Sequence, residues 1–344
     1  MSWSVRRQSL LLVYLLALAL LWSNAYFVLV NHAAYTVDER SYLQMAEGNF
    51  AVPVTHRYRV VVPVVAGSLA RGLAVVTALI SPTGNRPFGL SFFLVNGLVL
   101  ALAGLFLFRT ARAHGAAAGP ALVGMAAVMT SGAASYVTGL VLVDSVVVLA
   151  VVLLYYALRI RLGWLLLAVL VVGPVLKESF GLFLPLALYG RFVPWWQRLL
   201  ALAGAAGLVV ALHAVVDAQV PPAAVGSVAN ALEHGRNIIS NLHWLLSPRG
   251  LFICSSVFGL FNLLILAGFW GGRTAIRQWL PQLRPGPALL VLAAVLAHML
   301  LSGEMSRMLL LAAPVVAVAV ALILDRHPLF APLRRLLTAG EKPV

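Results

Sequence analysis

Apolar stretches long enough to cross a bilayer recur along this chain, and they constrain its fold more than any other feature. A helix needs roughly 20 apolar residues to cross the hydrocarbon core. The candidate spans are 9–30, 88–108, 118–135, 139–158, 163–176, 179–190, 199–216, 250–271, 286–302 and 306–324. Only 10% of the residues are charged, too few to cover a water-soluble globule. We therefore expect an all-α polytopic membrane protein with about ten transmembrane helices and interfacial helices on its outer face.

We expect a single transmembrane domain, 1–344, with two long outer segments. The first outer loop, 31–87, contains the apolar run 59–80, whose central Arg71 favours an interfacial helix over a span. The second outer loop, 217–249, contains an amphipathic helix. Residues 163–190 are expected to turn at "KES" rather than form one long helix with buried charges. The first apolar stretch is expected to be a retained helix rather than a cleaved signal peptide.

The charged residues predict an orientation in the membrane. Arginines gather at the ends of apolar stretches, as in Arg109/Arg112 and Arg159/Arg161, and basic loops favour the cytoplasm. This predicts a multi-pass protein of the cell membrane with both termini cytoplasmic. All of the ten carboxylates except Asp325 and Glu341 then fall on or near the outer face. The arginines do not interleave with aromatic residues, so nucleic acid is not an expected partner.

The first outer loop carries residue types suited to acid–base chemistry and to phosphate binding. Asp38 and Glu39 lie in "VDERSYLQMA", with Tyr42 on the same short helix. A carboxylate at the membrane surface can accept a proton from a hydroxyl group or hold a metal ion. In "HRYRVVVP", Arg57 and Arg59, with His56 beside them, suit a lipid phosphate. A solvated loop and ordinary headgroup anchoring are the alternatives.

Further ionisable residues lie within or next to apolar stretches, where such groups are costly and are candidates for function. Lys177 and Glu178 form one pair and Glu304 and Arg307 another, although each pair could be self-contained. Asp144 has no charged neighbour in sequence, so it needs a partner from another helix or a bound proton. In the second outer loop, His234 and Arg236 could contact a substrate, although surface solvation is the more ordinary interpretation.

The sequence contains no motif of a tight metal site or a nucleotide site. HExxH, repeated Asp clusters and GxxxxGK[ST] are missing, and Cys254 is the one cysteine. No cofactor is therefore expected with certainty, and a loosely held divalent cation at Asp38 and Glu39 stays open.

Four short elements together resemble the GT-C class of integral-membrane glycosyltransferases. They are "VDERSYLQMA", "RYRVVVP", "KESFGLFLP" and "GEMSRMLLLAAP", and they are spread over residues 36 to 314. Members of that class use polyprenyl-phosphate-linked sugars on the outer face. Many also carry a soluble outer domain after the last helix. Here the tail "GEKPV" is expected to lie inside, so acceptor recognition is expected to rest on 31–87 and 217–249 alone.

The resemblance implies a function and roles for particular residues. Asp38 would be the general base with Glu39 as its neighbour or substitute, and Arg57, Arg59, Lys177 and Arg307 would bind the donor phosphate. Tyr42, His56, Asp144, Glu178, Glu304, His234 and Arg236 would support them. The implied partners are a polyprenyl-phosphate-linked sugar, a lipid, glycan or protein acceptor, and membrane lipids. The alternative is a multi-pass transporter or a lipid or glycolipid flippase, which needs charges at mid-depth.

Overall fold

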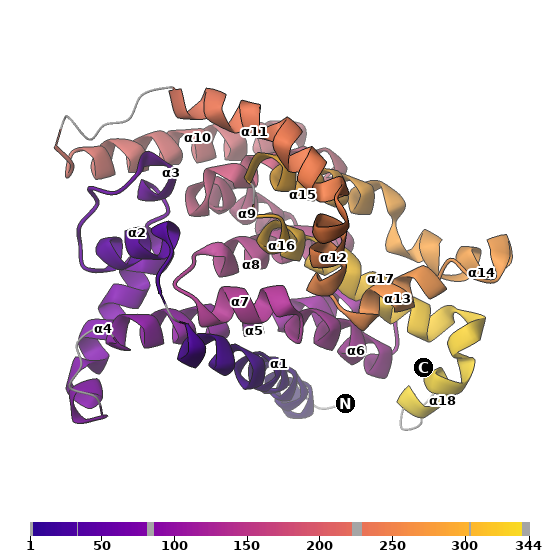
Figure 1. Ribbon diagram of the computed structural model, residues 1–344. Helices are drawn as coiled ribbons and strands as arrows, with labels where there is room; N and C mark the ends of the chain where they lie inside the picture. Colours follow the sequence, from indigo (N-terminus) through magenta and orange to yellow (C-terminus); the bar gives the residue numbers. More distant parts are fainter. Residues whose placement is uncertain (1–2, 33, 81–85, 222–228, 303, 339–344) are drawn as a thin grey trace.

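The computed structural model describes residues 3–32, 34–80, 86–221, 229–302 and 304–338, and it describes side chains within 8–32, 34–74, 88–221, 238–302 and 304–338. Every regular element in these residues is a helix (Figure 1). The α-helices are α1 (Trp3–Asn31), α2 (Val37–Ala46), α3 (Val54–Arg57), α4 (Val61–Ile80), α5 (Arg86–Ala113), α6 (Ala118–Met129), α7 (Gly132–Gly139), α8 (Asp144–Ile160), α9 (Gly163–Leu176), α10 (Trp195–Asp217), α11 (Ala229–Leu246), α12 (Pro248–Val257), α13 (Leu260–Ala267), α14 (Gly272–Trp279), α15 (Pro285–Ser302), α16 (Met305–Leu309), α17 (Ala313–Arg326) and α18 (Ala331–Leu337). The 3₁₀ helices are η1 (Glu178–Tyr189), η3 (Leu280–Leu283), η4 (Leu310–Ala312) and η5 (Pro328–Phe330).

Within the described residues, five helical stretches are long and apolar enough to cross a membrane. They are Gln8–Asn31, Phe88–Ala113, Trp195–Asp217, Pro285–Ser302 and Met305–Arg326, and the number rises to seven if each of two bent helix pairs is one span. The expected all-helical fold is thus observed in the described residues, and these stretches are consistent with a helical membrane protein. The expected number of about ten spans, and the outer position of 31–87 and 217–249, stay predictions.

The two bent pairs correct the straight spans expected over 118–135 and 250–271. α6 and α7 meet at 56°. Thr130 ends α6, and Ser131 caps α7 by accepting a hydrogen bond from the Ala134 amide at 3.1 Å. α12 and α13 meet at 89° around Gly259, whose φ of 53° lies in the left-handed region that glycine tolerates.

The core of the bundle is built on α5, α8 and α17. α5 packs against α1, α4, α6 and α8, while α17 packs against α6 and is buried from Ala313 to Leu324. Gly124 on α6 lies against the backbone of α17 at Ala317, an approach that leaves no space for a side chain. α1 and α10 lie on opposite sides of the molecule in Figure 1 and expose large apolar side chains such as Leu12 and Leu200. Such surfaces suit lipid rather than water.

The chain between α9 and η1 breaks at Lys177, as the sequence predicts. α9 ends at Leu176 and Lys177 is extended (φ −164°, ψ 129°), so it separates two short helices. The same break directs the Lys177 side chain into the molecule, where it is buried.

Candidate functional site

The segment after α1 is fixed by a capping box in which Glu39, and not Asp38, is the structural carboxylate. Glu39 Oε2 accepts hydrogen bonds from the Thr36 amide at 2.9 Å and hydroxyl at 3.0 Å, and lies 3.0 Å from His32 Nε2. Its Oε1 accepts the Val141 amide at 3.2 Å. Glu39 is fully buried, so it ties α2 to the connection between α7 and α8. This corrects its expected position as a neighbour of the base, because its oxygens are turned to other partners.

Asp38 lies one position earlier on α2 and faces a histidine and an arginine. Its Oδ1 is 3.2 Å from His56 Nε2, and its Oδ2 accepts from both terminal nitrogens of Arg307 at 3.2 Å. The side chain keeps 28% of its surface exposed. The hydrogen bond from His56 and the charge of Arg307 outweigh partial burial and lower the pKa of Asp38 from 3.8 to about 2. Asp38 is therefore an accessible carboxylate at neutral pH.

Arg307 on α16 also joins Asp38 to a second, more deeply buried ion pair. Its Nε lies 3.6 Å from Asp144 Oδ2, and Lys177 Nζ donates to Asp144 Oδ1 at 2.8 Å. Asp144, Lys177 and Arg307 are all less than 10% exposed. Asp144 was expected to need a partner from another helix or a bound proton, and the structure pairs it with Lys177, which lies between α9 and η1. Asp38, His56, Arg307, Asp144 and Lys177 form one continuous chain of contacts, here called the Asp38 cluster.

Arg59 lies at the edge of this cluster without a carboxylate of its own. Its Nη1 donates to Tyr42 Oη at 2.8 Å, and its buried Nε has no partner within the described residues. Burial raises the pKa of Tyr42 to about 12, so the phenol stays neutral and does not balance the charge of Arg59. Arg59 is thus a third cation at the site, within electrostatic reach of Lys177. Besides Asp38 and Asp144, the acids Glu178 and Glu304 lie within electrostatic reach of Arg59 and Arg307 respectively.

Arg57 lies in a different group of contacts. It is almost fully buried, with Nη1 donating to Asp217 at 3.1 Å and Nη2 to the Val52 carbonyl at 3.1 Å. Tyr58 also donates to Asp217, at 3.0 Å. The expected place of Arg57 beside Arg59 is corrected, because Asp217 at the end of α10 draws it away. Arg57 thus fixes the segment between α1 and α4 to α10.

The remaining candidates do not complete the cluster. Glu178 lies 3.8 Å from His213 rather than pairing with Lys177, so that self-contained pair does not form. Glu304 is exposed, and Arg307 pairs with Asp38 and Asp144 instead of with Glu304. The side chains of His234 and Arg236 lie outside the described residues.

The described residues do not gather ligands for a metal ion. They include no group of three His, Cys, Asp or Glu side chains placed to hold one. Asp38 and Glu39, the pair considered for a divalent cation, face separate partners, namely Arg307 and the Thr36 cap. The carboxylates at this site are placed for ion pairs and hydrogen bonds.

Some residues at the site were not found from the sequence. Ser41 contacts the other ring nitrogen of His56 at 3.1 Å, and His213 stacks on Tyr58 with ring centroids 3.6 Å apart. No local sequence pattern indicates either contact. A local pattern does indicate the role of Glu39, because Thr36 and Glu39 stand at the spacing of a capping box.

The geometry therefore joins a partly exposed carboxylate, Asp38, to Arg307 and, through Asp144, to Lys177, which come from distant parts of the chain. Comparison of the chain with family models, with curated proteins and with solved structures finds no match.

Proposed function

We propose that the protein is a membrane glycosyltransferase that moves a sugar from a polyprenyl-phosphate donor to an acceptor hydroxyl. The observation that carries the proposal is the contact of Arg307 with Asp38, which places a proton acceptor beside a phosphate-binding group. The two residues are 269 positions apart in sequence. Their contact therefore depends on the fold and is not a by-product of local structure.

The contacts of Arg59 support a phosphate as the group bound here. Arg59 donates to the neutral phenol of Tyr42, and its buried Nε has no partner within the described residues, so an anion beside it would satisfy this donor. Cations held in advance at this position would stabilise the charge that develops on a departing phosphate. The departing group would carry that charge away as polyprenyl phosphate.

The reaction consists of one displacement at the anomeric carbon. The acceptor oxygen forms a bond to that carbon, the bond from the carbon to the phosphate oxygen breaks, and the hydroxyl proton passes to Asp38. The sugar–phosphate bond supplies the free energy. In the resting protein Asp38 is a weak base, since His56 and Arg307 lower its pKa to about 2. A donor phosphate that draws Arg307 toward itself raises the basicity of Asp38 when donor is bound.

The finer topology belongs to the same proposal. About ten spans of the cell membrane would place both termini in the cytoplasm and the Asp38 cluster at the extracytoplasmic face. There the donor would enter laterally from the outer leaflet. The exposed apolar side chains of α1 and α10 support a lipid surface around the bundle.

The test is Asp38→Asn in the full-length protein, assayed with a panel of radiolabelled polyprenyl-phosphate hexoses and pentoses and with cell-envelope extract as acceptor. The amide keeps the shape of the side chain but cannot take the proton, so transfer should fall by about 10²–10⁴-fold. Glu47→Gln is the matched control, since Glu47 is an exposed acid at the end of the same helix.

Elution from a sizing column and the melting temperature in detergent show whether each variant is folded. Unchanged transfer by a folded Asp38→Asn protein would remove Asp38 from the reaction. Equal losses in Asp38→Asn and Glu47→Gln would show that the effect is not specific to the cluster.

A further inference from the structure

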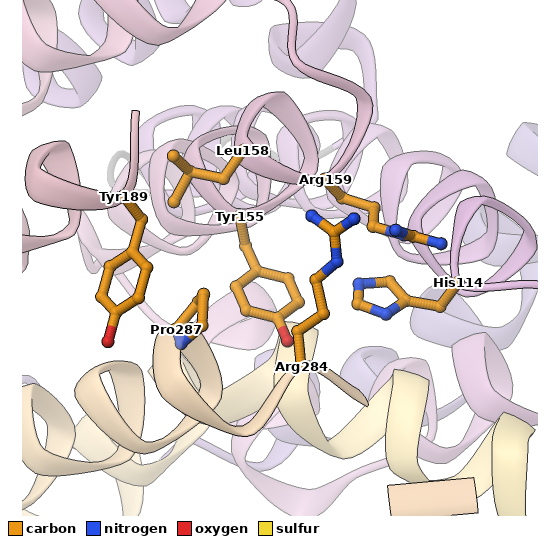
Figure 2. Close-up of a pocket in the computed structure, with 7 residues that line it drawn as sticks. All are labelled: His114, Tyr155, Leu158, Arg159, Tyr189, Arg284 and Pro287. Carbon is orange, nitrogen blue, oxygen red and sulfur yellow. The ribbon is translucent and has the colours of Figure 1, made fainter. Parts of the chain in front are cut away.

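A cavity lies at the other end of α8 from the Asp38 cluster. It has a volume of about 150 Å³ and is lined by residues from the ends of α5, α8 and η1 and from the start of α15 (Figure 2). Asp144 begins α8, whereas Tyr155 and Arg159 on its last turns line the cavity. The helix has 17 residues and is about 25 Å long, so the cavity is separate from the proposed active site.

Two arginines face this cavity without a carboxylate. Arg159 donates from Nε to the Ala113 carbonyl at 2.8 Å, and neither Arg159 nor Arg284 forms an ion pair within the described residues. Figure 2 shows the Arg284 side chain passing the Tyr155 ring toward Arg159. Two like charges brought together in a partly enclosed space favour an anion between them.

The backbone holds Arg284 in an uncommon conformation. Its φ of 54° and ψ of 80° place a residue with a full side chain in the left-handed region, immediately before Pro285. Arg284 is the C-cap of η3, a position where helices often end in this conformation, as α8 does at Arg161. Here the Leu283 carbonyl beside it accepts a hydrogen bond from Tyr155 at 3.0 Å, which fixes the segment to α8.

His114 supplies the cavity with an acceptor that has no partner. The ring is 1% exposed, it stacks on Tyr155 with an interplanar angle of 7°, and its Nδ1 donates to the Gln282 carbonyl. Burial lowers the pKa of His114 to about 4, so the ring is neutral at pH 7 and Nε2 is an acceptor. Nε2 is buried and has no hydrogen-bond partner within the described residues.

From this arrangement we infer that the cavity binds a singly protonated phosphate group, either inorganic phosphate or the monoester headgroup of a lipid. The two guanidinium groups bind the charged oxygens, and the P–OH hydrogen satisfies His114 Nε2. The volume of the cavity is about ten times the roughly 10–15 Å³ that one water molecule requires. This volume is sufficient for the five non-hydrogen atoms of a phosphate. Sulfate and phosphodiesters carry no such hydrogen at pH 7, so the site discriminates against them.

The test measures binding to full-length protein in phosphatidylcholine nanodiscs at pH 7 by calorimetry. Inorganic phosphate should bind at least tenfold more tightly than sulfate. Phosphatidic acid, a monoester, should be retained over phosphatidylglycerol, a diester, when lipids are identified by native mass spectrometry. Binding of phosphate alone identifies a free anion as the ligand, and retention of phosphatidic acid alone identifies a headgroup. Either outcome supports the site. If neither phosphate nor phosphatidic acid binds, the inference is overturned.

Three variants separate the contributions. Arg159→Gln and Arg284→Gln should each weaken the binding of phosphate and of sulfate at least tenfold. Arg277 is an exposed arginine on α14, and Arg277→Gln should change the binding less than twofold. His114→Phe should keep charge-driven binding but abolish the preference for phosphate over sulfate.

Gly286→Ala adds a variant that leaves every charge in place. A methyl group at Gly286 would lie 2.8 Å from the Tyr189 hydroxyl at the cavity wall, so it should reduce the affinity for phosphate by narrowing the cavity. Equal loss in Arg277→Gln and Arg284→Gln would show diffuse surface charge and overturn the inference. A phosphate preference that survives in folded His114→Phe protein would overturn the role of His114.

Discussion

At the scale of single residues, two adjacent carboxylates have separate tasks because successive side chains on a helix point about 100° apart. Glu39 points into the bundle, where each of its oxygens accepts hydrogen bonds. Asp38 instead faces α3 and α16, where its partners are the ionisable side chains of His56 and Arg307. The sequence placed both acids in one candidate site, and only the direction of the side chains separates them.

Glu39→Gln tests the structural role of the buried carboxylate. The amide nitrogen would face donors that now meet an oxygen, so we expect the free energy of unfolding to fall by about 1–3 kcal/mol. Heat-induced unfolding in detergent micelles measures the change. Glu47→Gln, an exposed substitution of the same kind, should have no effect, and an equally stable Glu39→Gln protein would contradict the capping role.

At the scale of elements, the break between α9 and η1 positions Lys177. Phe180, fully buried on η1, packs directly against the backbone of Gly173 on α9. This contact folds η1 back on α9 and sets the direction in which Lys177 leaves the chain toward Asp144. The sequence predicted the break because charges avoid the membrane interior, but the packing that fixes its angle has no local signal.

Gly173→Ala tests whether this contact positions Lys177. The added methyl group would overlap the Phe180 ring, and the overpacking should cost about 1–3 kcal/mol. It should also reduce sugar transfer, because Lys177 moves with η1. Gly181→Ala is the matched control, since a methyl group there meets nothing within 4 Å. Equal stability and activity of the two variants would contradict this account.

At the scale of the whole molecule, the sequence predicted the class of fold better than its details. Apolar length and low charge predicted a helical membrane protein, and the described residues contain five stretches suited to span. The bends at Ser131 and Gly259 were missed because apolar composition continues through them. The meeting of Asp38, Asp144, Lys177 and Arg307 could not be derived, because periodicity within one helix does not determine which helices are neighbours.

The two ends of the bundle should face opposite sides of the membrane. Glu47 lies beyond α2 near the Asp38 cluster, whereas Arg277 on α14 precedes η3, whose Leu283 carbonyl meets the last turns of α8. Figure 1 shows α2 and α14 at opposite ends of the molecule. In a Cys254→Ala background, a membrane-impermeant maleimide should label Glu47→Cys in intact cells and Arg277→Cys only after permeabilisation. Labelling of both cysteine variants in intact cells would place the Asp38 cluster and the cavity at Arg159 and Arg284 on the same side of the membrane. The proposed orientation would then be wrong.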